Sequence, residues 1–485
     1  MPVPALPSTS PRPLISAPVT YSPRDRLVRP GRRDPWLLAG ALFVAYTAVS
    51  LFRYRHMASR SWDLGIFEQA IRAYAHLRVP VADLKGPGSD ILGDHFSPVT
   101  ALLAPVYRVF PSPVTLLVAQ AALFAVSAVP VTRAAGALLG RRRGLALGLA
   151  YGLSWGLQRA VDFDFHEICF AVPLIAWSLE AVLAGRWRRA LCWALPLVLV
   201  KEDLGMTLAA IAVVVAIRAR RTSPRTAWSA LGVAVLGVAA TVVTLTLVIP
   251  AFNTTGAYGY WDKVGGSGGD PFDGFDTKLR TLAWLLIPTS GLLALRSPLL
   301  LVALPTVGWR FVSSDSSYWG TDWHYSAVLM PVVTLALADA LTVVGSSPRP
   351  RLRSYAHHAP TAVVAAALAL TTTLPMSALS EPDAYGKPAG VKAVERLLAR
   401  IPDGASVEAN IGPISRLTSR CRVFWVGNTR GIAPDFIAVD NNRKWLSDAE
   451  EYAKQLHPRA TYTVEDSTHG YVLMKRETPD VTGGP

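Results

Sequence analysis

The chain has 485 residues, of which 51% are hydrophobic and only 17% are charged. Since about a quarter of the residues in soluble globular proteins are charged, this composition argues against an ordinary soluble enzyme. A net charge of +14 would suggest nucleic-acid binding in a soluble protein. Here the basic residues form short clusters between apolar blocks, as in cytoplasmic loops, so we expect a polytopic α-helical membrane protein with no nucleic-acid partner.

Residues 1–35 are rich in proline and serine and end in an arginine cluster. They lack the apolar core and cleavage site of a signal peptide, so we expect a disordered arm. Because basic segments stay on the cytoplasmic side, the arm predicts a cytoplasmic N-terminus and a multi-pass location in the cytoplasmic (inner) membrane. The first span, residues 36 to about 52, then crosses outward.

A long polar segment, residues 53–98, follows the first span and faces outward in this orientation. Its stretch LGIFEQAIRAYAHL is typical of a helix on the membrane surface, with an apolar face formed by Ile66, Ala70, Ile71, Tyr74 and Leu77.

Basic clusters at 141–143, 185–189 and 218–221 separate the next apolar blocks. If each cluster lies inside, the chain crosses the membrane an even number of times between neighbouring clusters. Residues 144–160 and 168–184 then form one hairpin with DFDFHE at its outer turn. Residues 190–217 form a second, with Lys201-Glu202-Asp203 where two short helices meet, because each charge in mid-bilayer would cost about 2.5 kcal/mol or more. The same reasoning gives about eleven spans within residues 36–376.

Residues 377–485 change in composition and predict a small α/β domain on the outer side of the membrane. We expect strands at 406–409 and 422–426, and further strands in PDFIAVD and GYVLMKR. This domain is either a lid or structural cap, or a direct participant in catalysis.

Acidic and imidazole side chains gather at the outer ends of the predicted spans, whereas the inner turns carry little except arginine and glycine. Charged groups in a membrane protein are costly, so they mark a cavity, an ion path or an active site. Together with nearby cations, the candidates are Asp63, Glu68, Arg72, Asp94, His95, Arg159, Asp162, Asp164, His166, Glu167, Lys201, Glu202, Asp203, Asp322 and His324.

Several of these residues have a structural alternative. Asp63 can cap the helix that begins at Leu64, GDHFSP can be a turn closed by Pro98, and DWHY can belong to an interfacial aromatic belt. The alternative is weakest for Lys201-Glu202-Asp203, whose charges must be paired or hydrated, and we expect them to pair with one another. The sequence has no GxxxxGK[ST] or HExxH motif, which argues against ATP hydrolysis and zinc proteolysis.

The order of six motifs resembles DUF2079, a family of predicted bacterial membrane proteins. The similarity covers roughly residues 36 to 475, and the motifs are SWDLGIFEQA, GDHFSPVTALLAPVYRVFPSP, DFDFHE, LVLVKEDLG, DWHYSAVLMP and IPDGASVEANIGPISRLTSR. That family in turn resembles the GT-C glycosyltransferases, integral membrane enzymes that use polyprenyl-phosphate sugars. The resemblance implies a GT-C-like fold and membrane lipids as partners.

The resemblance also implies a reaction at the outer face. A sugar would pass from a polyprenyl-phosphate donor to the hydroxyl of a cell-envelope glycan, lipid or protein. Asp63 matches the key acidic residue of the first outer loop and would act as general base. Lys201, Arg159 or Arg72 would hold the phosphate. His95, His166 and Glu167 would position substrates or share a divalent cation with Asp63, with Mg²⁺ or Mn²⁺ suited to oxygen-rich ligation.

The alternative function is a transporter or a lipid- or glycan-handling protein without transferase activity. In that case the same charges would line a translocation path, distributed through the bilayer depth and often repeated between two halves of the chain. The charges lie near the outer ends and no internal repeat is evident, which favours the enzyme.

Overall fold

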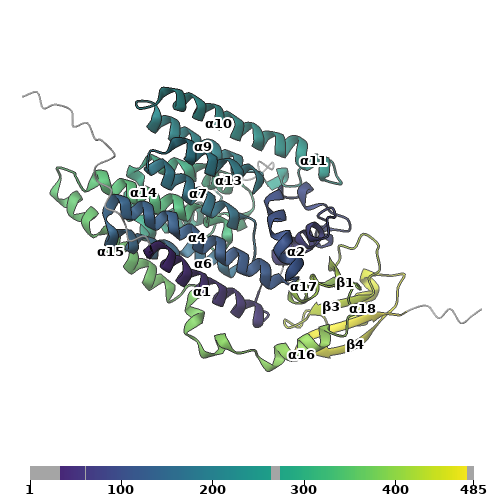
Figure 1. Cartoon of the computed structure of the whole chain (residues 1–485). Helices are drawn as coiled ribbons and strands as arrows, with labels where there is room; N and C mark the ends of the chain where they lie inside the picture. The colour runs from purple at the N-terminus through teal and green to yellow at the C-terminus, as the bar shows by residue number, and fades with distance from the viewer. Residues whose placement is uncertain (1–32, 60–61, 264–272, 478–485) are drawn as a thin grey trace, which may run out of the picture.

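The computed structural model describes residues 33–59, 62–263 and 273–477. A bundle of helices forms most of the molecule, and a small sheet formed by the C-terminal segment lies at one end of the bundle (Figure 1). The helices before the sheet are α1 (Asp34–Arg55), α2 (Trp62–Ala75), α3 (Ala104–Val109), α4 (Pro113–Leu139), α5 (Arg141–Gly152), α6 (Trp155–Asp162), α7 (Ile168–Leu183), α8 (Trp187–Ala194), α9 (Leu204–Ala219), α10 (Pro224–Val243), α11 (Ile249–Phe252), α12 (Phe275–Ser290), α13 (Leu304–Val312), α14 (Leu329–Val344) and α15 (Pro350–Thr371).

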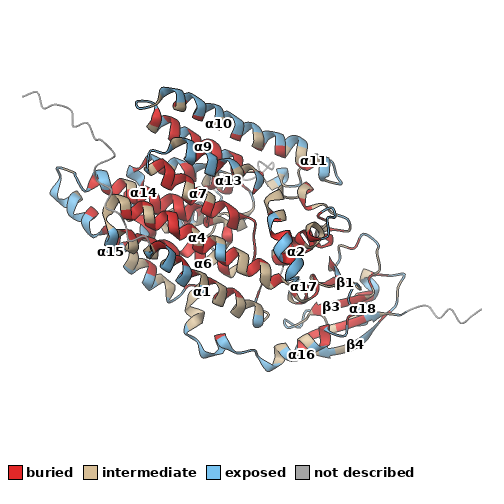
Figure 2. Ribbon diagram, viewed as in Figure 1, coloured by how far each residue is buried: buried red, intermediate tan, exposed pale blue. Residues whose placement is uncertain are grey.

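Within the described residues, four helical segments are long and apolar enough to cross a membrane: Asp34–Arg55, Pro113–Leu139, Pro224–Phe252 and His324–Val344. Shorter apolar helices lie at Ile168–Leu183, Leu204–Ala219 and Pro298–Val312. The predicted total of about eleven spans is therefore not confirmed. The apolar helices remain those of a membrane protein, because the outermost one, α10, exposes large hydrophobic side chains such as Trp228 and Val235 (Figure 2).

The segment predicted as one span over 144–160 is instead two helices, α5 and α6. The chain leaves the helical conformation at Ser154, whose ψ is 142°. The break is tolerated because Gln158 Nε2 donates a hydrogen bond to the Leu153 carbonyl at 2.8 Å, so a carbonyl freed by the break is satisfied inside the protein.

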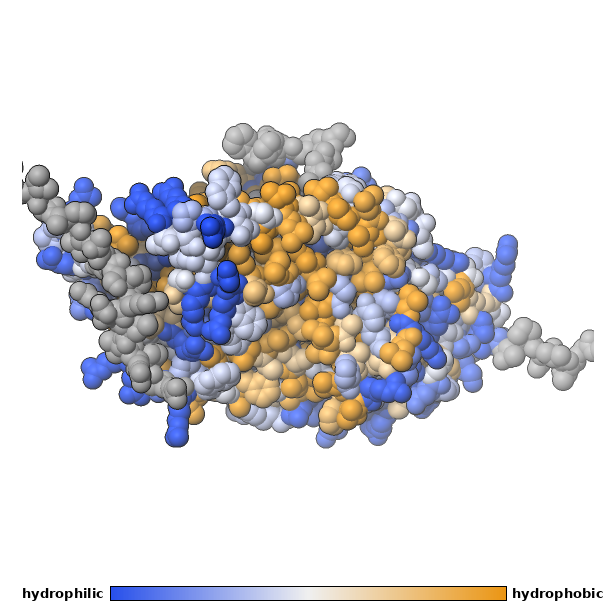
Figure 3. Space-filling model, turned by 45° about the horizontal axis from the view of Figure 1, so that its top comes forward, coloured by the Kyte–Doolittle hydropathy of each residue, from blue (hydrophilic) through white to orange (hydrophobic). Residues whose placement is uncertain are grey.

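Ion pairs show which helix ends lie together. Asp34 pairs with Arg141 and Asp339 pairs with Arg218, each at 2.5 Å, which joins the basic clusters at one end of the bundle. At the other end Arg53 pairs with Asp162 at 3.1 Å, near the C-terminal sheet. Hydrophobic residues cover the middle of the face in Figure 3, between hydrophilic residues at both ends.

The C-terminal segment folds as α16 (Ala389–Leu398), β1 (Ser406–Ala409), α17 (Ile411–Leu417), β2 (Arg422–Trp425), β3 (Phe436–Asp440), α18 (Ala449–Leu456), β4 (Tyr462–Thr468) and β5 (Tyr471–Arg476). The sheet order is β2-β1-β3-β5-β4. β1 runs parallel to β2 and β3, whereas β5 is antiparallel to both β3 and β4. All four expected strands are confirmed. β4 was not expected, because it is a polar edge strand whose middle residues are exposed.

The predicted helix in the first loop exists as α2, but its position differs from the prediction. Residues 64–71 are all buried, because α2 is enclosed between the helical bundle and the C-terminal segment. Ile66 and Ala70 belong to the same hydrophobic core as Val407 and Ile414 of the C-terminal segment. Leu77 is 94% exposed and lies beyond the end of the helix. A membrane-surface helix needs one polar face, and α2 instead packs against protein on more than one side.

Candidate active site

A cavity of about 650 Å³ lies at the end of the bundle that carries the C-terminal sheet. Its walls come from the first turn of α2, the loop after it, the turn before α9, the segment after α11, and the residues around α13. Eight of the candidate residues line it: Asp63, Asp94, His95, His166, Lys201, Glu202, Asp203 and His324. The remaining wall is largely aromatic and apolar, and includes Phe67, Met206 and Trp309.

Lys201 and Glu202 bind partners from distant parts of the chain. Lys201 Nζ lies 3.1 Å from Glu167 Oε1, and Glu202 Oε1 lies 2.8 Å from His95 Nδ1. Glu167 also contacts His166 Nδ1 at 2.6 Å. The prediction that Lys201, Glu202 and Asp203 pair mainly with one another is therefore wrong. Neighbouring side chains in a turn point in different directions, so Lys201 and Glu202 each find a partner on another element and fix that element in the cavity wall. Asp203 Oδ1 is buried without a hydrogen-bond partner among the described residues.

Asp94 and His95 join the first loop to the segment after α11. Lys85 Nζ lies 3.0 Å from Asp94 Oδ2, while the Tyr260 hydroxyl donates to Asp94 Oδ1 at 3.1 Å. The Tyr260 ring stacks on His95 with centroids 4.7 Å apart. Burial acts to raise the pKa of Asp94, but the charges of His95 and Lys85 outweigh it and hold that pKa below its usual value.

The pKa of His95 is shifted in the opposite direction, above its usual value. Burial acts to lower the pKa of this imidazole, but the carboxylates of Glu202 and Asp94 outweigh burial and raise it. The protonated ring therefore persists to higher pH than in an unperturbed histidine.

Asp63 lies in the first described turn of α2 and is half-buried in the cavity wall. No hydrogen bond or ion pair joins its carboxylate to another residue in the described part of the chain. Burial is the largest influence on this group and raises the pKa of Asp63, with His166 and Lys85 acting in the opposite direction. A carboxylate with a raised pKa and free oxygens is suited to accept a proton from a bound hydroxyl group.

His324 is buried against His166, and the two rings stack with centroids 3.6 Å apart. Both ring nitrogens of His324 lack a hydrogen-bond partner among the residues that the structure describes. Because buried polar groups are normally hydrogen-bonded, two unsatisfied nitrogens in a cavity wall indicate a place for a polar ligand.

The other candidates lie outside the cavity. Glu68 is fully buried and accepts hydrogen bonds from the hydroxyls of Tyr107 and Thr418, and Arg72 donates to the carbonyls of Thr418 and Cys421. Both side chains therefore hold α2 against α3 and the C-terminal segment. Five further candidates do not line the cavity: Arg159, Asp162, Asp164, Glu167 and Asp322. Asp162 pairs with Arg53, and Arg159 lies 4.0 Å from Asp322. Glu167 pairs with Lys201, and the backbone carbonyl of Asp164 accepts a hydrogen bond from Gln120.

Several cavity residues were not predicted. Lys85 and Lys263 add two cations, and Tyr258 donates to Glu202 at 3.3 Å. Lys263 Nζ lies 2.9 Å from Asp315. For Tyr258 and Lys263 the signal was the string YGYWDK, which places three aromatic residues beside a lysine, whereas Lys85 lies outside that string.

Possible metal ligands do not cluster in the described part of the chain. Within residues 33–59, 62–263 and 273–477, no three His, Cys, Asp or Glu side chains are arranged so that they would hold a metal ion. Shared ligation of Mg²⁺ or Mn²⁺ by Asp63, His95, His166 and Glu167 stays a prediction, and Glu167 is already engaged with Lys201.

The family model described as "Predicted membrane protein (DUF2079)" matches residues 53–473. The chain belongs to this family. No curated protein matches the chain.

The fold is similar to that of ArnT from Cupriavidus metallidurans. The crystal structure of ArnT bound to undecaprenyl phosphate aligns with a TM-score of 0.56 at 14% identity, and the apo structure with 0.50 at 12%. In both cases the alignment covers 94% of this chain and 100% of ArnT. At this level of identity the comparison establishes a shared fold over nearly the whole length of the chain.

Proposed function

We propose that this DUF2079 protein is a GT-C-type membrane glycosyltransferase. It transfers a sugar from a polyprenyl-phosphate donor to a hydroxyl group of a cell-envelope glycan, lipid or protein. It resides in the cytoplasmic membrane with the N-terminus inside, so that residues 377–485 and the cavity face outward. The observation that carries the proposal is the cavity itself, which combines a half-buried carboxylate without a described partner with three lysines and an apolar wall.

The three lysines that line the cavity can bind a phosphate group. Lys85, Lys201 and Lys263 each contact one carboxylate, and an ammonium group has three N–H donors. Each lysine therefore keeps donors for phosphate oxygens while its partner fixes its position. The apolar residues of the same wall, such as Met206 and Leu245, suit the first isoprene units of the lipid. ArnT has a similar fold and was crystallised with undecaprenyl phosphate, which supports this class of lipid as a partner.

The transfer step would use Asp63 as the base. The acceptor oxygen attacks the anomeric carbon of the sugar and forms a new C–O bond, while the bond from that carbon to the phosphate oxygen breaks. The leaving lipid phosphate takes the electron pair and is stabilised by the lysines. The acceptor proton passes to Asp63. His324, with two nitrogens that lack described partners, would hydrogen-bond the sugar or the phosphate.

A transfer assay with Asp63→Asn tests this proposal. The amide keeps the shape of the side chain but does not accept the proton, so turnover should fall by about 10²–10⁴-fold while the unfolding midpoint stays unchanged. The substrates are a panel of undecaprenyl-phosphate sugars with cell-envelope extract as acceptor, and release of undecaprenyl phosphate is measured.

Asp162→Asn is the matched control, since Asp162 pairs with Arg53 outside the cavity wall. That variant should keep its activity. Full activity of Asp63→Asn would refute the assignment of the base. Binding of the lipid phosphate without transfer of any sugar in the panel would favour the alternative, a lipid-handling protein.

A further inference from the structure

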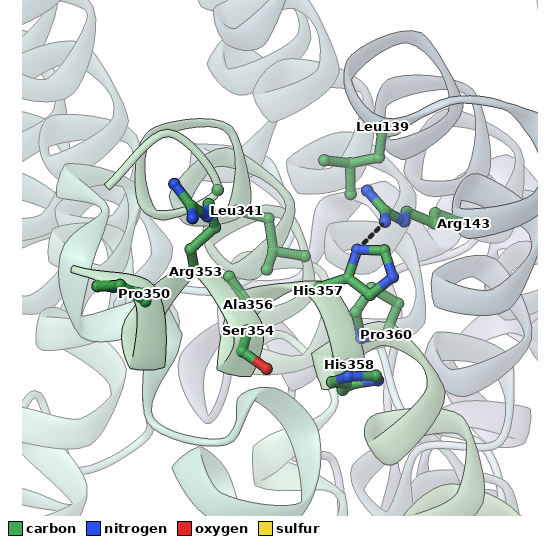
Figure 4. Close-up of a pocket in the computed structure, with 11 residues that line it drawn as sticks. Leu139, Arg143, Leu341, Pro350, Arg353, Ser354, Ala356, His357, His358 and Pro360 are labelled. Carbon is green, nitrogen blue, oxygen red and sulfur yellow. Dashed lines mark hydrogen bonds between the residues drawn. The ribbon is translucent and has the colours of Figure 1, made fainter. Parts of the chain in front are cut away.

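A second hollow of about 450 Å³ lies at the opposite end of the bundle, where α4 ends and α5 begins and where the chain turns from α14 into α15 (Figure 4). Four of its lining side chains carry or can carry positive charge: Arg143, Arg353, His357 and His358. Ser354 adds a hydroxyl group, and none of the described lining residues is acidic.

Two of the cationic side chains that line this hollow contact each other. Arg143 Nη2 lies 2.8 Å from His357 Nδ1, and Figure 4 shows these two side chains pointing toward one another. Because the guanidinium donates to Nδ1, the proton of a neutral His357 is on Nε2, where it is available to an acceptor. Arg353 has no ion-pair partner within the described part of the chain.

The acidic residues at this end of the bundle do not neutralise the hollow. Asp34 is bound to Arg141 and Asp339 to Arg218, both at 2.5 Å. A concave site with several cations and no carboxylate in its wall attracts an anion, and the fork of an arginine matches the oxygens of a phosphate.

The surroundings of the hollow are apolar. His358 also lines a second depression of about 470 Å³, whose other residues run along α15 from Tyr355 to Leu370 and include Ile287 and Pro288 of α12. Val343, at the end of α14, is 68% exposed. Cations bordered by exposed apolar side chains are typical of the membrane interface, where a headgroup meets acyl chains.

From these features we propose that the hollow binds the phosphate of an anionic phospholipid headgroup. The ligand chemistry is a phosphate ester, and the apolar border favours a lipid over free phosphate. This site lies at the other end of the bundle from the proposed active site and does not depend on the proposed function.

The test measures lipid binding to the purified full-length protein by native mass spectrometry. Dioleoylphosphatidylglycerol and dioleoylphosphatidylcholine are compared, with inorganic phosphate as a third probe. Wild type should prefer the phosphatidylglycerol. Arg143→Gln/Arg353→Gln should weaken its binding by about 25-fold, since each cation near the membrane surface contributes about fivefold in affinity.

The matched control is Arg188→Gln/Arg220→Gln, which removes two exposed arginines elsewhere. It should change the affinity less than threefold. An equal loss in the control would refute the site, because general surface charge would then explain the preference. Tighter binding of inorganic phosphate than of phosphatidylglycerol would overturn the lipid as ligand. If the double variant fails to fold, Arg353→Gln alone, at an exposed position, should still weaken binding about fivefold, and unchanged binding there would refute the site.

Discussion

Replacing Lys201 by methionine should destabilise the protein strongly, because its partner stays buried. Glu167 is completely buried, and Lys201 Nζ lies 3.1 Å from its Oε1. Methionine fills a similar volume without the charge, so Glu167 keeps only His166 as an ionic partner, at 2.6 Å. Breaking a buried pair by removing one partner typically costs about 3–5 kcal/mol.

The expected size of the effect follows from the length of the chain. With the usual unfolding entropy per residue, 485 residues correspond to about 1 kcal/mol per degree at the midpoint, so Lys201→Met should lower the unfolding midpoint by about 3–5 °C. The midpoint is measured in detergent by the fluorescence of the tryptophans.

Two further variants separate pairing from simple loss of a side chain. Arg188→Met, at an exposed position of α8, should leave the midpoint within about 1 °C. Lys201→Met/Glu167→Gln removes both charges and should recover part of the lost stability. If Lys201→Met is as stable as Arg188→Met, or if the double variant is less stable than the sum of the single changes, the buried pair does not stabilise the structure as argued.

Three other predictions concern the contacts that hold the cavity wall. Burial raises the pKa of Glu68 to about 7, so between about pH 4.5 and 7 the folded state keeps a proton that the unfolded chain releases. The stability contributed by this group should therefore fall as pH rises from about 4.5 to about 7 and stay constant above that, and Glu68→Gln should flatten this dependence of the unfolding midpoint on pH. Gly65→Ala should cost about 1–3 kcal/mol, read from the same midpoint, because the added methyl group would overlap Ile414; an unchanged midpoint would mean that α2 is free to move. Tyr260→Phe removes the hydrogen bond to Asp94 and should raise KM for the lipid donor with a smaller effect on kcat, whereas an unchanged KM would show that the contact does not shape the site.

Much of the helical bundle and the sheet could be predicted from the sequence. Long apolar runs fix α1, α4 and α10, and the short apolar run FIAV fixes β3, whose first four residues are all buried, because in each case the local pattern and the final burial agree. The break between α5 and α6 was missed, since it depends on Gln158, a side chain that replaces a backbone partner. The number of membrane spans could not be predicted from the hydrophobic pattern either, because a short apolar helix in a bundle does not have to cross the whole membrane.

The candidate site was predicted in part. Asp63, His95 and Lys201 come together as expected from the clustering of charges at one end of the spans. Glu68 and Arg72 belong to the same helix as Asp63, but they lie on faces that pack against α3 and the C-terminal segment. The sequence of α2 does not show this, since the partners Thr418 and Cys421 are about 350 positions further along the chain. Pairing across such separations depends on the tertiary fold.

The most direct test of the central claim is the binding of undecaprenyl phosphate to the cavity. Lys85→Gln/Lys263→Gln removes two of the three lysines, and Lys392→Gln/Lys444→Gln removes two exposed lysines of the C-terminal segment as a matched control. Binding is measured with radiolabelled lipid and purified protein. We expect the cavity variant to bind at least tenfold more weakly than wild type and the control to bind normally, because each charge-assisted hydrogen bond contributes about 1.5–3 kcal/mol. Equal affinity of the cavity variant and the wild type would contradict the assignment of this cavity to a polyprenyl phosphate.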